Sequence, residues 1–415
     1  MKILHVIPAV APRYGGPSQA VIEMCLALQR AGLHVELCTT DADGDGRLTV
    51  ELDKPTLYHG VQTHFFRRDR SEAFKFSRSL ARWLDGNVAR YDIVHIHAVF
   101  SHATYAAAKA CQRHQIPYIV RPLGTLEPWS MQQKRPRKML GWHLLFRRIL
   151  RKAAAVHYTT TQERELTEQS LNLSKGITIP NGVDEALLVV ESTGTFRKQH
   201  DIPADAMMAL CLSRLHPKKG IDLLLETFLD LRTQGKLVPC HLVLAGNGDP
   251  SYVSRLRGIV QGTAVESSVH WTGWLEGESK FAALAEANLF VLNSFQENFG
   301  IGAVEAMACG TPVLLSRQVG LAADVAEHGA GWIVDLQQCG LRNGLLEATA
   351  DVTEARRRGA NARRLVADRF TWPRISVQLR SLYESVLASR KSAVVGELAR
   401  RVAEQIPAKA HGRAR

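Results

Sequence analysis

Short apolar segments alternate with helix-like segments along almost the whole chain, and this alternation restricts the possible folds more than any other feature. In the first half, the pattern predicts strands at 3–7, 35–39, 93–96 and 118–120 and helices at 18–30 and 104–114. Strands that alternate with helices favour a parallel sheet covered by helices on both faces. We therefore expect a doubly wound α/β domain in this half.

A second series of the same kind fills the rest of the chain. Its predicted strands lie at 208–214, 242–245, 271–275, 288–292, 313–316 and 331–334. The turn at 180–184 and the polar, aperiodic stretch 191–205 separate the two series, as expected of an interdomain linker. The predicted units are an N-terminal domain at 1–185, a linker at 186–205, a C-terminal domain at 206–370, a helix at 371–388 and a basic tail at 389–415.

The composition agrees with an ordinary globular enzyme. The 415 residues are 46% apolar and 22% charged, and this length favours two or three domains. The seven cysteines are scattered without Cys-x-x-Cys or zinc spacing, and no apolar run reaches the ~18 residues of a membrane span. These patterns predict reduced, buried thiols in a cytoplasmic protein without a signal peptide or a transmembrane helix.

Positive charge is concentrated in two segments. The net charge is +12, and the basic tail with +5 and Lys134 to Lys152 with eight Lys/Arg and no acid account for all of it, which leaves the rest of the chain about neutral. The second of these segments is apolar along one side, and a basic amphipathic helix suits an anionic membrane surface or a lipid-phosphate acceptor. Both segments could then hold the protein on the inner face of the cell membrane. Alternatively, the apolar side packs on its own domain. No nucleic-acid-binding motif accompanies the charge, so we expect no nucleic-acid partner.

The most specific motif contains two glutamates, Glu297 and Glu305, on either side of a Phe-Gly turn between a predicted strand and a short helix. A loop at the carboxyl end of a parallel strand offers backbone N–H groups to an anion and carboxylates to sugar hydroxyls, which suits a nucleotide sugar. The alternative for Glu305 is a helix residue that pairs with a lysine. The flanking sequence Glu-Ala-Met-Ala-Cys-Gly-Thr-Pro-Val argues against that alternative.

The segment from Glu297 to Val313 closely resembles the paired-glutamate motif of the family 4 glycosyltransferases, which are retaining enzymes with the two-domain GT-B fold. Similar segments run from about Lys2 to Leu387. The resemblance implies two Rossmann-like domains that face a cleft, with the last helix crossing back onto the N-terminal domain. It assigns the ribose hydroxyls to Glu305, and the donor sugar to Glu297 and the loop after it, namely Asn298, Phe299, Gly300 and Ile301.

Arg214 and Lys219 lie in the first loop of the second series, between a strand and a helix. Arginine binds phosphate oxygens through a planar fork and lysine as a point charge, so the two can neutralise a diphosphate without a metal. In the resembling family, an Arg and a Lys of this loop stabilise the departing nucleoside diphosphate. Lys219, directly before Gly220, matches that lysine better than Lys218 does. The alternative is a pair of ordinary surface charges.

Three other loops also match loops of the family. The resemblance adds to the donor site the glycine loops and the nucleobase loop, namely Gly15 and Gly16, then Gly246, Asn247 and Gly248, then Trp274 and Leu275. Alone, these glycines would indicate only turns, and the two apolar residues only core. A nicotinamide-dependent oxidoreductase would need Gly-x-Gly-x-x-Gly after the first strand. The chain lacks that pattern, and Asp41 alone does not support such an enzyme.

His95 and His97 lie on one face of a predicted strand, because strand side chains alternate. Two imidazoles can bind a metal, but no third ligand follows at the usual spacing, so we predict no metal site. The resembling family often has a histidine at this strand end that contacts the donor sugar, and this selects His97, expected to face the cleft. The alternative is a buried histidine that bonds to a backbone carbonyl.

The loop 121–129 resembles a loop that some bacterial polysaccharide members of the family carry before a basic helix. Arg121 and Glu127 are candidates for contacts with the acceptor. A loop this rich in Pro and Gly can equally be a rigid connector. The sequence assigns these two residues no chemistry.

Together these observations predict a retaining glycosyltransferase that needs neither metal nor cofactor. A UDP-, GDP- or ADP-sugar would bind mainly to the C-terminal domain, and a glycan or lipid-linked acceptor of cell-envelope polysaccharide synthesis to the N-terminal domain. The catalytic centre would consist of His97, Arg214, Lys219 and Glu297, with the cations stabilising the leaving diphosphate. A nucleotide-sugar 2-epimerase of the same fold and a non-catalytic sugar-nucleotide-binding protein are the alternatives.

Overall fold

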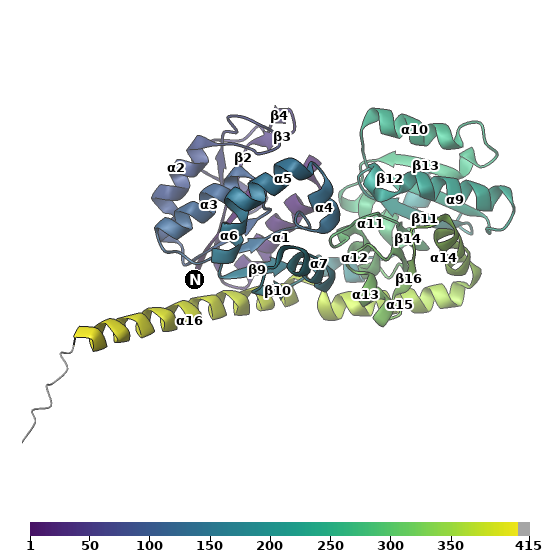
Figure 1. Cartoon of the computed structure of the whole chain (residues 1–415). Helices are drawn as coiled ribbons and strands as arrows, with labels where there is room; N and C mark the ends of the chain where they lie inside the picture. The colour runs from purple at the N-terminus through teal and green to yellow at the C-terminus, as the bar shows by residue number, and fades with distance from the viewer. Residues whose placement is uncertain (406–415) are drawn as a thin grey trace, which may run out of the picture.

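The structure is a computed structural model that describes residues 1–405, with side chains described up to residue 390 except at residue 338. Two sheets flanked by helices lie side by side (Figure 1). The N-terminal sheet has the strand order β10-β9-β8-β7-β1-β2-β6-β5 and is parallel except for the edge pair of β5 and β6. Its strands are β1 (Lys2–Ala9), β2 (His34–Thr40), β5 (Pro55–Tyr58), β6 (Val61–Phe66), β7 (Ile93–His97), β8 (Tyr118–Arg121), β9 (Ala155–Tyr158) and β10 (Gly176–Thr178); β3 (Ala42–Asp43) and β4 (Gly46–Arg47) form a separate hairpin.

The C-terminal sheet has the order β13-β12-β11-β14-β15-β16, and all its neighbouring strands are parallel. Its strands are β11 (Met207–Leu212), β12 (Cys240–Ala245), β13 (Val269–Gly273), β14 (Leu289–Leu292), β15 (Val313–Ser316) and β16 (Gly331–Val334). The expected α/β class with two doubly wound parallel sheets is confirmed. The antiparallel edge strand β5 and the small antiparallel hairpin of β3 and β4 depart from it.

Helices cover both faces of each sheet. In the N-terminal domain they are α1 (Gly16–Arg30), α2 (Arg78–Asn87), α3 (His102–Arg113), α4 (Pro128–Gln132), α5 (Arg135–Gly141), α6 (Arg147–Lys152) and α7 (Thr161–Leu171), with short turns η1 (Pro12–Tyr14) and η2 (Val88–Arg90) and the π-helical turn η3 (Trp142–Phe146). After β10 come η4 (Glu185–Val189), α8 (Thr195–Gln199), η5 (Pro217–Lys219), α9 (Ile221–Thr233), α10 (Pro250–Val260), η6 (Glu266–Ser268), α11 (Gly277–Glu286), α12 (Ile301–Ala308), α13 (Ala322–Glu327), α14 (Gln338–Ala350), α15 (Val352–Arg369) and α16 (Trp372–Gln405).

The core follows from the alternation of apolar side chains along the buried strands. One face of the N-terminal sheet packs on α2, α3 and α6, and the other packs on α1 and α16. The C-terminal sheet packs on α12 and α15 on one face, and on α9 and α14 on the other. All seven cysteines are free, and all but Cys339 are buried.

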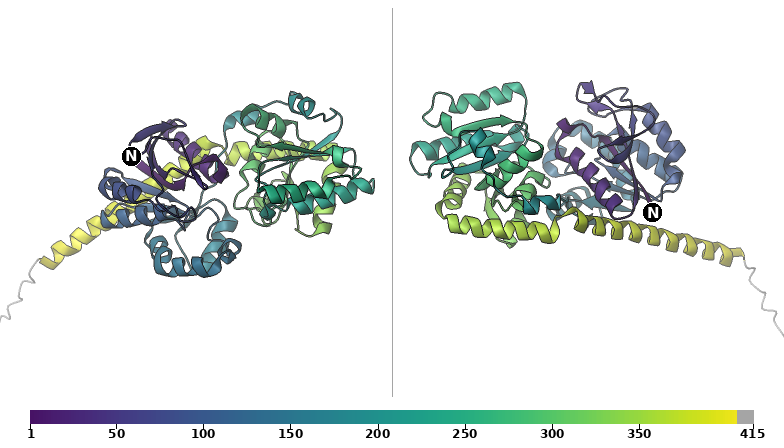
Figure 2. Two further views of the ribbon diagram at one scale, coloured as in Figure 1. Left: turned by 90° about the horizontal axis from the view of Figure 1, so that it is seen from above. Right: turned by 180° about the vertical axis from the view of Figure 1, so that it is seen from behind.

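The chain crosses between the domains twice, at adjacent places. The backbone N–H of Val183 donates to Phe370 O at 2.8 Å, and that of Trp372 donates to Val183 O at 3.2 Å. Helix α16 then runs back along the N-terminal domain, as Figure 2 shows, and continues to Gln405 beyond the expected end at 388. The rest of the predicted basic tail, 406–415, lies outside the described residues. Within the described part of the chain, no helix is both long and apolar enough to span a membrane.

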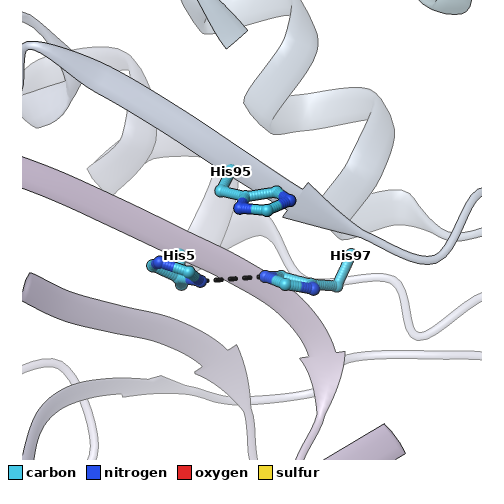
Figure 3. A group of neighbouring side chains, drawn as sticks. All are labelled: His5, His95 and His97. Atoms are coloured by element: carbon cyan, nitrogen blue, oxygen red, sulfur yellow. Dashed lines mark hydrogen bonds between the residues drawn. The ribbon is translucent and has the colours of Figure 1, made fainter. Parts of the chain in front are cut away.

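The expectation that His97 faces the cleft is wrong. The side chain has no exposed area, and its Nε2 lies 2.9 Å from Nδ1 of His5 on β1 (Figure 3). Nearby, His95 Nδ1 lies 2.8 Å from the hydroxyl of Tyr383 on α16. The alternation along β7 places both its histidines on one face, but that face is the one that α16 covers.

The three histidines of Figure 3 have nitrogens within 4.8 Å of one another, yet their arrangement disfavours a metal ion. The ring of His95 stacks on that of His97, with centroids 4.6 Å apart, so their in-plane lone pairs do not converge. Both nitrogens of His95 already have neighbours, Tyr383 and His157. The buried guanidinium of Arg121 adds a positive charge close to the rings, which opposes a cation.

Burial, reinforced by Arg121, lowers the pKa of His5 to about 3. Burial likewise holds the pKa values of His95, His97 and His157 well below 6.5, with neighbouring charged groups adding to the effect. A neutral histidine can act as both donor and acceptor in such a chain of rings. The cluster therefore consists of neutral imidazoles that link the N-terminal sheet to α16.

These histidines should make folding sensitive to acid. Because their folded pKa values are depressed, their stabilising contribution is complete above about pH 6.5 and is lost as the pH falls below it. Each histidine that is neutral in the folded state and protonated in the unfolded state adds a slope of about 1.4 kcal/mol per pH unit. Urea unfolding at a series of pH values should show a slope that is the sum of these contributions. In His5→Gln the slope should be smaller by the contribution of about one histidine. The exposed His59→Gln should keep the full slope, and equal slopes in all three proteins would contradict the assignment.

Candidate active site

Loops at the carboxyl ends of the C-terminal strands meet the N-terminal domain at its glycine loop. The side chain of Arg214, after β11, lies against Gly15, with Nε 3.7 Å from where a Cβ on Gly15 would stand. A Cβ on Gly16 would lie 2.9 Å from Cδ1 of Ile301. Glycines at both positions therefore allow the two domains to approach closely. The structure thus brings together four of the residues expected at the donor site.

An ion pair between Lys219 and Glu297 forms the centre of this region. The loops that carry them are joined directly, because Phe295 N–H donates to Lys218 O at 2.8 Å and the amide of Asn293 donates to Gly220 O at 2.7 Å. Burial opposes ionisation of Glu297, but Lys219, Lys218 and Arg214 outweigh it and hold the pKa of its carboxyl below the usual value. Glu297 is therefore an ionised carboxylate in a cluster of three cations.

Glu305 lies on α12, nearly buried, and accepts a hydrogen bond from Lys280 Nζ at 2.6 Å. Helix α12 begins after Gly300, whose φ of +90° suits glycine. The pair matches the alternative that the sequence left open, a glutamate paired with a lysine. The sequence did not predict Lys280 as a site residue, because it lies on a different helix, α11, within an ordinary amphipathic pattern.

The second glycine loop is built by close backbone contacts. Gly246, with φ of +138°, donates its N–H to Gly273 O at 2.7 Å, and a Cβ on it would lie 1.9 Å from Ser213 O. Gly246, Asn247 and Gly248 line a cavity of about 430 Å³ together with Trp271 and Arg257. Arg257 lies over the Trp271 ring, 4.8 Å from its centroid.

The two residues expected at the nucleobase differ in their surroundings. Trp274 is 45% exposed, whereas Leu275 packs partly against the core beneath α12. Further along, Phe299 is a core residue whose ring meets that of Phe370 edge to face, at 5.9 Å between centroids. Only the backbone of Phe299 is therefore free to contact a ligand. The roles of all these loops in donor binding stay predictions.

The loop 121–129, to which the sequence assigned no chemistry, contacts the C-terminal domain. Glu127 accepts a hydrogen bond from Gln296, and the Trp129 ring lies 5.2 Å from Lys218 Nζ. Arg121 is fully buried against Asn181 instead. The sequence contains no signal for the contacts of Glu127 and Trp129, because each joins residues on different domains.

Two family models match the chain in the order of its domains. Residues 15–182 match the glycosyl transferase 4-like domain, and residues 192–365 match the glycosyl transferases group 1. Among curated relatives, the D-inositol 3-phosphate glycosyltransferase of Jonesia denitrificans is 25% identical over 412 residues, covering 92% of this chain and 95% of that protein. The phosphatidyl-myo-inositol mannosyltransferase of Mycobacterium tuberculosis is 28% identical over 223 residues, covering 52% and 56%.

Solved structures share the fold over nearly the whole chain. HepE of Anabaena, in complex with UDP and glucose, has a TM-score of 0.73 at 21% identity, covering 93% of this chain and 100% of that one. Sucrose-phosphate synthase from Thermosynechococcus elongatus has a TM-score of 0.74 at 23% identity, covering 94% and 99%. The relatives favour sugar transfer over the epimerase and non-catalytic alternatives. With both of its domains matched in order, the chain belongs to the group 1, family 4-type retaining glycosyltransferases of the GT-B fold, enzymes that transfer a sugar from a nucleotide-sugar donor.

Proposed function

We propose that the donor is a UDP-sugar and that its diphosphate binds Arg214 and Lys219 without a metal ion or another cofactor. The observation that carries the proposal is the ionised Glu297 surrounded by cations at the meeting point of the two domains. A diphosphate would compete with Glu297 for Lys219, and the released carboxylate would accept hydrogen bonds from the donor sugar. HepE, which has the same fold, was solved with UDP and glucose, and this supports uridine as the base.

The transfer would then depend on fixed positive charge. Arg214 and Lys219 stabilise charge that develops on the leaving diphosphate, where prearranged donors contribute most. A diphosphate oxygen takes the proton of the acceptor hydroxyl on the same face of the sugar, which retains the configuration. Glu305 binds the ribose hydroxyls together with Lys280, the glycine loops lie along the phosphates, and the loop of Trp274 and Leu275 lines the base. His97 has no place in this set because it is buried in the histidine cluster.

Removing the charge of Lys219 should weaken UDP binding. Charge-assisted hydrogen bonds contribute about 1.5–3 kcal/mol, so Lys219→Ala and Arg214→Ala should each lower UDP affinity by about tenfold or more. Isothermal titration calorimetry in the presence of EDTA measures this and tests the metal-free proposal at once. Lys236→Ala, an exposed lysine of the same domain, is the matched control. Undiminished affinity in both variants, or binding that requires Mg²⁺, would contradict the proposal.

We further propose that the acceptor is lipid-linked and that the segment 134–152 holds the enzyme on the cytoplasmic face of a membrane. The structure divides the apolar residues of this segment between two environments. Trp142, Phe146, Ile149 and Leu150 pack in the domain core, whereas Leu140 and Leu144 are 62% and 69% exposed. Both leucines lie among the eight basic residues of the segment, a combination that suits an anionic membrane. One relative is named for a phosphatidyl lipid, which agrees with a lipid acceptor.

The two exposed leucines provide a direct test. Burying a leucine in an apolar phase contributes about 1.5–3 kcal/mol, so Leu140→Ser combined with Leu144→Ser should weaken binding to vesicles of phosphatidylcholine and phosphatidylglycerol by tenfold or more, roughly. Leu57→Ser, an equally exposed leucine on β5, should bind like the wild type. Co-sedimentation measures the binding. A wild type that binds anionic vesicles no better than pure phosphatidylcholine vesicles would overturn the proposal.

A further inference from the structure

A single loop of the N-terminal domain contacts the sequence neighbours of both partners in the Lys219–Glu297 pair. Glu127, at 6% exposure, accepts a hydrogen bond from the side chain of Gln296, which precedes Glu297. Two residues further along the loop, Trp129 places its ring 5.2 Å from Nζ of Lys218. Through this loop, the N-terminal domain contacts a residue directly beside each charged group of the pair.

Asn298, on the other side of Glu297, is held in the same way. With the nitrogen of its amide facing the carboxylates, Asn298 donates to Glu127 Oε1 and to Glu163 Oε2, at 3.0 Å each, and accepts from Thr159 Oγ1 at 2.8 Å. Glu163 is itself fixed, because it accepts from the N–H groups of Gly124 at 2.6 Å and Thr159 at 2.8 Å. The two carboxylates thus bind the amides on both sides of Glu297.

The backbone geometry explains why this matters for Glu297. The segment pairs with the chain at 318–320, since Glu297 N–H donates to Gln318 O at 3.2 Å and Gly320 N–H donates to Glu297 O at 2.9 Å. In an extended chain, successive side chains point to opposite sides. Gln296 and Asn298 point to the N-terminal domain, so Glu297 points away from it, toward Lys219. Holding the two amides fixes the direction of the carboxylate between them.

We propose that Glu127 is a positioning residue: by binding Gln296 and Asn298 across the domains, it directs Glu297 toward the donor sugar and makes the sugar site complete only when the domains are closed. The inference rests on the proposed role of Glu297 in binding the donor sugar. Glu127 needs two acceptor oxygens for this task, because each of its partners is an N–H donor.

The charge on Glu127 should therefore control the contact. Burial raises the pKa of Glu127 to about 7, with a further contribution from Glu163 on α7; Gln296 and Lys218 lower it, and Glu297 raises it. Below this pH, one oxygen carries a proton and turns from acceptor to donor, so one of the two amides loses its partner. Glu127→Gln has the same defect at every pH.

The experiment compares UDP-glucose with UDP, because only UDP-glucose carries the sugar that Glu297 would bind. By calorimetry, Glu127→Gln should bind UDP-glucose about tenfold more weakly than the wild type but bind UDP within about twofold. The wild type should bind UDP-glucose more tightly than Glu127→Gln does, and this difference in affinity should shrink as the pH falls through about 7. The titration of UDP itself affects both proteins equally. The ratio of the wild-type affinity to the Glu127→Gln affinity, compared at each pH, therefore reports on Glu127 alone. Glu165→Gln, an exposed glutamate on α7, should match the wild type throughout.

Hydrogen exchange in the ligand-free protein adds a test that does not depend on the donor. The backbone amides at 296–300 should exchange faster in Glu127→Gln than in the wild type, whereas amides of the core strand β12 should not change. Unchanged exchange at 296–300, or an equal loss of affinity for UDP and UDP-glucose, overturns the positioning role. If the wild type binds neither nucleotide, the donor assignment fails separately, and exchange alone then decides whether Glu127 holds the segment.

Discussion

The ion pair between Lys219 and Glu297 is the interaction on which the geometry of the candidate active site depends. Each group is largely withdrawn from water, and the cost of burying each charge is offset by the opposite charge of its partner. The pair joins the loop after β11 to the loop after β14, which are the carboxyl ends of neighbouring strands. Under the proposed function, it also keeps one carboxylate and one ammonium available for a ligand that can separate them. A diphosphate with an attached sugar has the groups needed to do so.

Parallel sheets make this arrangement possible, because all their strands end at the same edge. The loops after β11, β12, β13 and β14 therefore gather phosphate-binding, base-binding and sugar-binding candidates from four distant parts of the sequence. The crossing of the chain at Val183 and Phe370 keeps the two domains together, and α16 closes the far face of the N-terminal sheet. The buried histidines belong to that packing and not to the cleft.

Much of the fold and part of the site could be predicted from local patterns. Period-two and helical spacing located most strands and helices, and the Phe-Gly loop with its two glutamates located the region where the domains meet.

His97 shows what such local patterns cannot predict. Alternation along β7 indicates which residues share a face, but the partner that covers this face, Tyr383, is 288 positions away from His95 in the chain. The basic segment behaves similarly: its sequence is amphipathic, yet only packing shows that Trp142 is core and Leu144 exposed.

The residue types at each strand end, and hence the chemical groups available to a nucleotide sugar, follow from the amino-acid sequence alone, because a strand, a glycine turn and a helix start are local structures. Which of these groups pair with one another was decided by the tertiary structure. Lys280 with Glu305, and Glu127 with Gln296, are contacts between segments whose distance depends on how helices and domains pack. The periodicity of the sequence does not predict such contacts, because they become favourable only when the two surfaces meet and exclude water.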